Sequence, residues 1–292
     1  MNPITFSVLI VTWNRAEQLK RAFESILSQV LKPNEVVVIN NNSSDDTCRV
    51  LDYYRTVFFM EGIQFKAIKL PYNMGCPPAR NIGLVNCNSD YIYSLDDDGF
   101  LEKNALYEMR VLIERLDEPP YVIASEIRSP DDAVITQYSK FVEKKYNFSA
   151  GACLISKISI QEGYIFPNYF RQMEESNLLY SLWFNNKPVY INPKSVMYHD
   201  KIVKGRVLHD EVRLNYINEM KNISSQVRVP DSILIFLYKS YKHIPHYISL
   251  KSKYSFSILY DFSYCAILTL FNKRKMNTSL RDYLLFSKKG RK

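Results

Sequence analysis

Three consecutive carboxylates, Asp96, Asp97 and Asp98, end an apolar run at 91–95 and are followed by Gly99. In an extended chain alternate side chains share a face, so we expect Asp96 and Asp98 to converge while Asp97 points away. Two converging carboxylates suit Mg²⁺ or Mn²⁺, hard cations that complete their coordination with substrate phosphate and water. Taken alone, the run also fits a solvated acidic turn, so its place in the fold must decide.

The residues before this run alternate strand and helix signals. Short β-branched apolar runs at 7–12 and 35–40 are typical of strands buried on both faces of a sheet. Between them Asn14 and Glu17 have the spacing of a capping box. A helix is predicted there because apolar residues recur at helical spacing, namely Leu19, Ala22, Phe23, Ile26, Leu27 and Val30.

The same alternation continues along the chain. It predicts helices at 50–58, 77–86, 102–115, 174–185 and 207–222, and strands at 65–70, 91–95, 121–127 and 188–192. Successive strand and helix signals indicate an α/β fold with a mainly parallel sheet flanked by helices. Ligands of such sheets bind outside the carboxyl ends of the strands, where the Asp run falls.

Six segments in order carry a resemblance to a known family. They read VLIVTWNRAEQLKRAFESILSQ, EVVVINNNSSDDT, NMGCPPARNIGLVNCNSDYIYSLDDDGF, SAGACLIS, RQMEESNLLYSL and VMYHD. Together they resemble family 2 glycosyltransferases of the GT-A (Rossmann-like) fold, bacterial cell-surface polysaccharide type, over roughly residues 5–200. The resemblance implies a nucleotide-sugar-binding catalytic domain over 1–205 and an inverting transferase of glycan assembly. Residues 206–292 would form a basic, aromatic, mostly helical extension.

The resemblance also implies a role for the carboxylates at 96–98. A divalent metal would bridge the diphosphate of a nucleotide-sugar donor, with Asp98 coordinating it and Asp96 nearer the ribose or the metal. Asp97 is expected beside the donor as well. His199 stands where related enzymes often carry a histidine near the metal; imidazole suits Mn²⁺ better than Mg²⁺. An ordinary hydrogen-bonded histidine is the alternative.

An acidic pair opens the segment 174–185. The resemblance implies that Glu175 is the general base that takes the proton of the acceptor hydroxyl, with Glu174 as the alternative. Glu175 lies one turn before Leu178 and Leu179 and so leans toward the same side of the helix. Acidic residues matched to the dipole of a helix start would explain the pair equally well without catalysis.

The donor nucleotide is expected at the ends of the first strands. Related enzymes often have an Asp after the second strand, whereas this chain has three Asn residues, whose amides both donate and accept. An Arg in the element ARN can pair with phosphate, although a surface helix position is its alternative. The nucleotide-binding candidates are Thr12, Trp13, Asn14, Arg15, Asn40, Asn42, Arg80 and Asn81.

The excess positive charge sits at the C-terminal end. Residues 1–199 carry 20 Lys and Arg against 23 Asp and Glu, whereas residues 200–292 carry 18 against 7. The apolar stretch 254–271 has Asp261 near its centre, which would cost about 3 kcal/mol in a membrane span. We therefore expect peripheral membrane contact through 230–292, useful for a glycan or lipid-linked acceptor, unless the segment is an ordinary helical subdomain.

Composition bears on the cellular compartment of the protein and on its alternative functions. The five cysteines are scattered without a C-x-x-C pair, and the N-terminal apolar run is too short for a signal sequence. We expect a cytoplasmic protein at the inner face of the cell membrane. A nucleotidyltransferase is an alternative, disfavoured by the lack of a glycine-rich phosphate loop. Nucleic-acid binding through the basic tail is another, and no nucleic acid is expected as a partner because residues 1–199 are not basic.

Overall fold

The computed structural model describes residues 3–133, 135, 143–144, 148–200, 208–249 and 255–271. The chain divides into two compact units. The first comprises Met1–Phe170 and Leu182–Ile202, and the second Arg171–Ser181 and Val203–Lys292. The second unit thus includes residues 171–181, which the sequence-based division assigned to the first domain.

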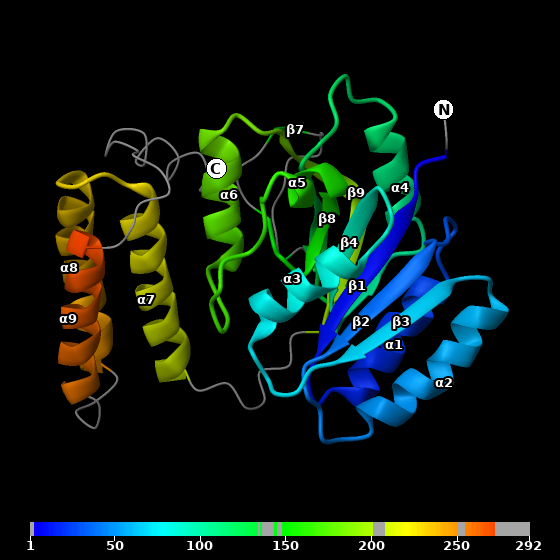
Figure 1. Ribbon diagram of the computed structural model, residues 1–292, viewed down its shortest axis with the longest axis horizontal. Helices are drawn as coiled ribbons and strands as arrows, with labels where there is room; N and C mark the ends of the chain where they lie inside the picture. Colours follow the sequence, from blue (N-terminus) through cyan, green and yellow to red (C-terminus); the bar gives the residue numbers. More distant parts are fainter. Residues whose placement is uncertain are drawn as a thin grey trace. The chain divides into compact units, whose positions relative to one another are not determined.

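The first unit is built on one sheet with the strand order β3-β2-β1-β4-β8-β6-β9-β5, with β7 paired to β9 (Figure 1). The strands are β1 (Phe6–Thr12), β2 (Glu35–Asn40), β3 (Gln64–Lys69), β4 (Tyr91–Asp96), β5 (Gly99–Leu101), β6 (Val122–Arg128), β7 (Glu143–Lys144), β8 (Ala152–Ser156) and β9 (Val189–His199). The predicted α/β fold class is confirmed.

Strands β1 to β4 pair in parallel, as the alternating pattern predicted. Beyond β4 the sheet is mixed, because β8 runs antiparallel to both β4 and β6. β9 runs parallel to β6 and continues well past the predicted strand at 188–192, reaching His199. This extension was not predicted, and it is what carries His199 to the edge of the sheet where β4 ends.

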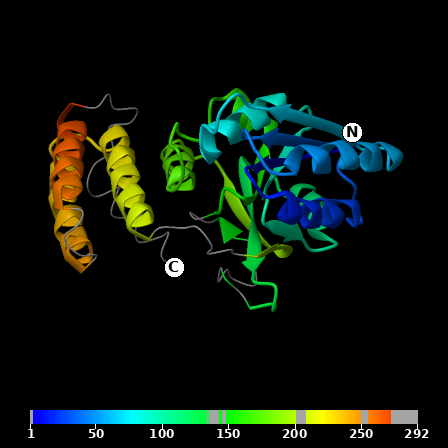
Figure 2. The ribbon, with the colours of Figure 1, turned by 90° about the horizontal axis from the view of Figure 1, so that it is seen from below.

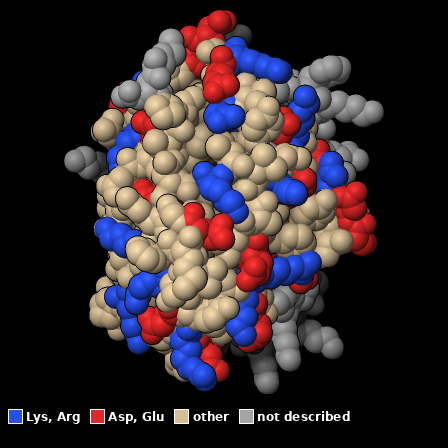
Figure 3. Space-filling view, turned by 90° about the vertical axis from the view of Figure 1, so that its right-hand side faces the viewer, with Lys and Arg blue, Asp and Glu red and all other residues tan. Residues whose placement is uncertain are grey.

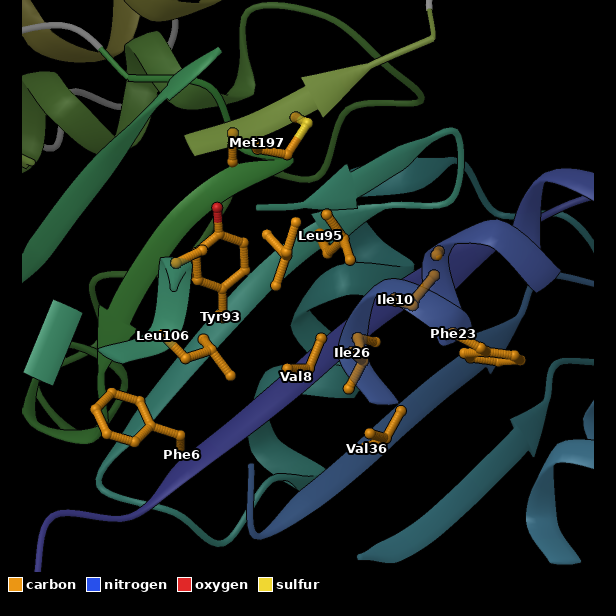
Figure 4. Close-up of a cluster of buried hydrophobic side chains, with 14 of the residues drawn as sticks. Phe6, Val8, Ile10, Phe23, Ile26, Val36, Tyr93, Leu95, Leu106 and Met197 are labelled. Atoms are coloured by element: carbon orange, nitrogen blue, oxygen red, sulfur yellow. The ribbon is translucent and has the colours of Figure 1, made fainter. Parts of the chain in front are cut away.

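Helices cover both faces of this sheet. They are α1 (Ala16–Leu27), α2 (Thr47–Met60), α3 (Cys76–Asn86), α4 (Ala105–Ile113) and the short α5 (Lys157–Gln161). Residues of α1, α2 and α4 share a core with Phe6, Val8 and Ile10, which alternate along one face of β1 (Figure 4). Leu9 points to the other face and packs against Gly83 of α3, which lies on the side away from α1 and α2 (Figure 2).

Two details of the first helix differ from prediction. The prediction of a capping box by Asn14 and Glu17 is wrong. The N-cap residue of α1 is Arg15, whose side chain makes no capping bond. The Asp45 carboxylate accepts from the Ala16 N–H instead, at 3.1 Å. Asn14 instead takes a left-handed backbone conformation and accepts a bond from the Ser44 N–H. The helix ends at Leu27, so Val30 lies beyond it and is exposed.

The second unit contains α7 (Leu208–Gln226), α8 (Asp231–Ser249) and α9 (Ser255–Phe271), and the unit boundary falls within α6 (Glu174–Phe184). Asp261, near the middle of α9, is buried and accepts two bonds from the Arg213 guanidinium of α7, at 2.5 and 2.8 Å. This charge therefore holds two helices together. Among the described helices, none combines the length and the apolar character that crossing a membrane requires.

Candidate active site

Asp96, Asp98 and His199 meet at one edge of the sheet in the first unit. Asp96 is the last residue of β4, Asp98 stands in the turn to β5, and His199 is the last residue of β9. The antiparallel pairing of Gly99 with His199 brings the two chain segments together. One possible ligand atom from each of the three side chains lies within 4.8 Å of the others. The geometry thus brings together the three residues that the sequence nominated as metal ligands.

Two arginines face this acidic cluster. Arg15 Nη1 donates to Asp98 Oδ2 at 2.6 Å, and Arg15 Nε lies 3.8 Å from Asp97 Oδ1. Arg80 Nη2 donates to Asp96 Oδ1 at 2.8 Å, and the Arg80 side chain is only 3% exposed. The alternative of a surface position for Arg80 is therefore wrong. Both cations neutralise carboxylates that would otherwise repel one another.

The carboxylates differ in their protonation equilibria. Burial works against ionisation of Asp98, but the hydrogen bond and charge of His199, together with Arg15, hold the pKa of Asp98 below its usual range. Burial raises the pKa of Asp97 to about 7, against the attraction of Arg15. Asp98 therefore stays ionised at neutral pH, which is the form that binds a cation.

A glycine that the sequence analysis did not single out makes room for Asp96. The Gly151 C=O accepts from the Asp96 N–H at 3.0 Å, and a Cβ added to Gly151 would lie 1.9 Å from Asp96 Cγ. Any larger residue at position 151 would displace the Asp96 carboxylate. The signal was present in the quoted segment SAGACLIS, but only the pairing of β4 with β8 discloses its purpose.

The predicted nucleotide-binding residues lie at the ends of β1 and β2. The Asn41 N–H donates to Thr12 O at 2.9 Å, which joins the two strand ends. Thr12 is buried, Trp13 is 51% exposed and Asn42 is exposed with a left-handed backbone. Asn40 Oδ1 accepts from the Ser43 N–H at 2.8 Å. Trp13 and Asn42 are thus accessible to a ligand, whereas the Asn40 amide helps to shape the loop.

Asn81 is engaged in the fold rather than displayed. Its Nδ2 donates to Phe166 O at 2.8 Å, and its Oδ1 accepts from the Phe166 N–H at 3.0 Å. The side-chain amide therefore pairs with one backbone residue through both of its polar atoms. This arrangement ties α3 to the loop around Phe166.

A small hollow opens next to Asp98. It has a volume of about 170 Å³ and is lined by Glu17, Gln18, Arg21, Asp98, Gly99 and Asp200. Arg21 Nη1 lies 3.0 Å from Asp200 Oδ2, and its guanidinium stacks 3.8 Å above the centre of the Phe100 ring. The hollow gives solvent and small ligands a route to the Asp98 side chain.

Glu174 and Glu175 begin α6, as predicted, and belong to the second unit. Glu174 is 8% exposed, and Glu175 is half-buried. Both glutamates thus belong to the second unit, whereas Asp96, Asp98 and His199 belong to the first. Leu178, Leu179 and Leu182, the predicted apolar stripe of this helix, are buried.

Comparison with known proteins identifies the family. The profile of "Glycosyl transferase family 2" matches residues 7–174, more than half of the chain. A GalNAc(5)-diNAcBac-PP-undecaprenol beta-1,3-glucosyltransferase of Campylobacter jejuni is 26% identical over 243 residues, 76% of this chain and 75% of that protein. Two staphylococcal relatives share a shorter segment, which spans 35% of this chain but only 31% and 24% of their own lengths.

Two solved structures have the same fold. One is S. aureus TarS 1–349 in complex with UDP-GlcNAc, with a TM-score of 0.65, 16% identity and coverage of 91% of this chain and 82% of that one. The other is the mannosyltransferase PcManGT of Pyrobaculum calidifontis in complex with GDP-Man and Mn²⁺, with a TM-score of 0.61, 13% identity and coverage of 92% and 88%.

Proposed function

The chain belongs to glycosyl transferase family 2 and is a glycosyltransferase, and from this premise we propose an inverting, metal-dependent reaction. A sugar would pass from a nucleotide-diphosphate donor to a hydroxyl of a glycan or lipid-linked acceptor in cell-surface polysaccharide assembly. The observation that carries this proposal is the meeting of Asp96, Asp98 and His199 at the carboxyl end of β4. Ligands of open α/β sheets bind at this position.

The donor set of this cluster fits a divalent cation. Two carboxylates and one imidazole suit Mn²⁺, and the carboxylates alone suit Mg²⁺. When bound, such an ion neutralises the charge that develops on a nucleoside diphosphate leaving group. The likeness to a mannosyltransferase solved with GDP-Man and Mn²⁺ supports this choice of donor class and ion.

The chain's own cations would serve the same leaving group. Arg15 reaches the cluster from the loop after β1, and its side chain is 26% exposed. A guanidinium in this position can pair with a phosphate oxygen as well as with a carboxylate. Arg80 is buried beneath Asp96 and would act by fixing that carboxylate. Thr12, Trp13, Asn14, Asn40 and Asn42 remain the candidates for the nucleotide loop, whereas the Asn81 amide is taken up by Phe166.

Inversion requires a base for the acceptor hydroxyl. We assign this role to Glu175, with Glu174 as the alternative, on the strength of the family resemblance of the segment RQMEESNLLYSL. The base would accept the hydroxyl proton as the oxygen attacks the anomeric carbon from the face opposite the diphosphate. Such general-base catalysis contributes about 10²- to 10⁴-fold.

The proposed stereochemistry has a direct test. The transferred sugar of the product is examined by proton NMR, where the coupling constant of the anomeric proton reports its configuration. A configuration opposite to that of the donor supports inversion. Retention of the donor configuration would overturn the inverting mechanism and the base role of Glu175 together.

We propose that α8 and α9 bind an anionic membrane surface, where a lipid-linked acceptor would lie. On α8 an exposed apolar stripe recurs at helical spacing, and on α9 a second one lies opposite the buried row of Asp261, Cys265 and Thr269. Lys242 lies 4.8 Å from the Tyr238 ring centre on α8, and residues 200–292 carry 18 basic against 7 acidic residues. The exposed side chains are Leu234, Leu237, Tyr238, Tyr241, Tyr260, Ile267, Leu270 and Phe271.

Aromatic and aliphatic side chains beside lysines are the composition that binds an anionic headgroup layer. The two carboxylates on the described parts of α8 and α9, Asp231 and Asp261, are each paired with an arginine and are 15% and 1% exposed. Little negative charge therefore opposes such a layer. The polyprenyl-linked acceptor named for the Campylobacter relative gives this contact a purpose, at the inner face of the membrane.

Vesicle sedimentation tests this contact without any donor or acceptor. Leu237→Glu combined with Tyr241→Glu is expected to weaken binding to phosphatidylglycerol vesicles about tenfold or more. Phe59→Glu, at an 81% exposed position on α2, is the matched control and should bind normally. Equal binding by all three proteins overturns the membrane proposal. A dimer of the native chain that the double variant abolishes would assign the face to a second copy instead.

Nucleotidyl transfer and nucleic-acid binding are not favoured. The match to the glycosyltransferase family already explains a nucleotide-binding fold, so nucleotidyl transfer is not needed to account for it. Nucleic-acid binding would need an extended basic surface. On the face of the first unit seen from the right of Figure 1, basic and acidic side chains are intermingled (Figure 3).

A further inference from the structure

A row of buried amides lies on one side of α7. Asn218, Asn222 and Gln226 follow one another at intervals of four residues and are 2%, 0% and 1% exposed. Residues spaced in this way share a face of a helix. Buried amides are stable only when their hydrogen bonds are made, so their partners indicate what the row is for.

Two of these amides, Asn218 and Asn222, donate to the backbone carbonyls directly before α6 in the same unit, whereas Gln226 Nε2 lies 3.5 Å from Ser181 Oγ of α6. Asn218 Nδ2 donates to Arg171 O at 2.8 Å and to Gln172 O at 3.0 Å. Asn222 Nδ2 donates to Met173 O at 3.1 Å, and its Oδ1 accepts from Asn177 Nδ2 at 2.8 Å. Two side chains of α7 thus hold three successive carbonyls and the first turn of α6.

The held segment has an unusual backbone. Gln172 and Met173 have φ values of 69° and 63°, in the left-handed region that residues with a side chain rarely adopt. Consecutive residues of this kind persist only where their surroundings fix them, and they cluster at functional sites. Glu174 and Glu175 follow immediately, so the direction in which these carboxylates leave the chain depends on this turn.

We propose that Asn218 and Asn222 are positioning residues that set the start of α6 and thereby the carboxylates of Glu174 and Glu175. The effect on catalysis rests on the proposed base role of Glu175 or Glu174, whereas the effect on the turn before α6 does not. It makes α7 a working part of the catalytic apparatus, because the carbonyls that α7 holds immediately precede the candidate base.

The test is the substitution Asn222→Asp. It keeps the size of the side chain and the acceptor for Asn177, but replaces the donor that faces Met173 O with an oxygen. Asn192→Asp is the matched control: Asn192 is 2% exposed, and its Nδ2 donates to Glu108 O at 2.9 Å in the first unit. Both variants lose one buried amide donor, so a general loss of stability affects them alike.

Amide hydrogen exchange over residues 174–178 is measured without ligands, followed by steady-state kinetics with the donor that the native protein turns over. Asn222→Asp is expected to speed exchange in this segment about tenfold, the loss of one buried hydrogen bond, while Asn192→Asp leaves it unchanged. We expect kcat to fall in Asn222→Asp with donor KM and Mn²⁺ affinity unchanged.

Unchanged exchange in Asn222→Asp, or an equal change in the control, overturns the positioning role. Faster exchange with native kcat overturns its catalytic consequence. If Glu174→Gln and Glu175→Gln also retain native kcat, the base assignment fails, whereas the exchange result still decides whether α7 positions the turn. The two failures are thereby distinguished.

Discussion

The guanidinium of Arg15 and the carboxylate of Asp98, 83 positions apart in the sequence, form an ion pair of 2.6 Å at the edge of the sheet. The other oxygen of Asp98 lies 3.1 Å from His199 Nε2. These contacts keep Asp98 ionised although it is nearly buried. The candidate metal ligand Asp98 is therefore already ionised, and both of its carboxylate oxygens are held in place.

Replacing this carboxylate should abolish metal binding. Asp98→Asn keeps the shape but removes the charge, and we expect Mn²⁺ affinity measured by calorimetry to fall about 100-fold or more, beyond the loss typical of outer-shell changes. Asp200→Asn is the control because Asp200 pairs with Arg21 and lies outside the cluster. Native affinity in Asp98→Asn would show that the cluster is not the metal site.

The room that Gly151 leaves for Asp96 can be tested in the same way. In Gly151→Ala the new methyl group would overlap the Asp96 carboxylate and separate it from Arg80. We expect weaker Mn²⁺ binding and a lower Tm, with overpacking of this kind costing about 1–3 kcal/mol. Unaltered Mn²⁺ binding by a folded Gly151→Ala protein would count against a role for Asp96 as a ligand.

We expect the stability of the protein to depend on pH through Asp97. Its pKa is raised to about 7, above the value of about 3.9 for an unfolded Asp, so the native state binds this proton more tightly. The contribution of Asp97 to the free energy of unfolding is fully present below the unfolded pKa and declines as the pH rises toward 7. Asp97→Asn removes the decline, so in EDTA its Tm should gain more over the native protein at pH 8 than at pH 5. An equal difference at both pH values would refute this.

Asn81 is expected to matter for folding more than for the metal. Asn81→Ala leaves the N–H and C=O of Phe166 without their side-chain partner, at about 1–3 kcal/mol for each buried group left unpaired. Denaturant unfolding should report this loss while Mn²⁺ affinity stays native. Asn86→Ala is the milder comparison, because it removes a bond to the Ile82 carbonyl within the helix and an exposed bond from the Lys66 ammonium. Native stability of Asn81→Ala would show that the Phe166 loop is held by other contacts.

The sequence predicted those parts of the fold that local pattern controls. Buried strands such as 7–12 and 35–40, and the helix that begins at Glu174, were found because apolar periodicity repeats over several residues. The convergence of Asp96 and Asp98 was expected from the two-residue period of a strand, but β4 ends at Asp96 and it is the turn to β5 that places Asp98. His199 was nominated by resemblance alone, since its neighbour Gly99 is 100 positions away.

What escaped prediction depends on contacts between distant segments. Asn14 has the right type and spacing for a cap, but Asp45 from the loop after β2 takes the bond to the start of α1. Gly151 and Asn222 are likewise ordinary in the sequence. Their roles arise only when β8 lies against β4 and α7 lies against the turn before α6. No single-sequence pattern encodes such pairings.

The most direct measurement is turnover and binding of a panel of nucleotide sugars, UDP-GlcNAc and GDP-Man among them, with Mn²⁺, with Mg²⁺ and with EDTA. The native chain is compared with Asp98→Ala and Glu175→Gln. The account predicts metal-dependent binding of one donor that is lost in Asp98→Ala and kept in Glu175→Gln, with turnover lost in both. Donor binding and turnover that persist in EDTA and in Asp98→Ala would contradict it.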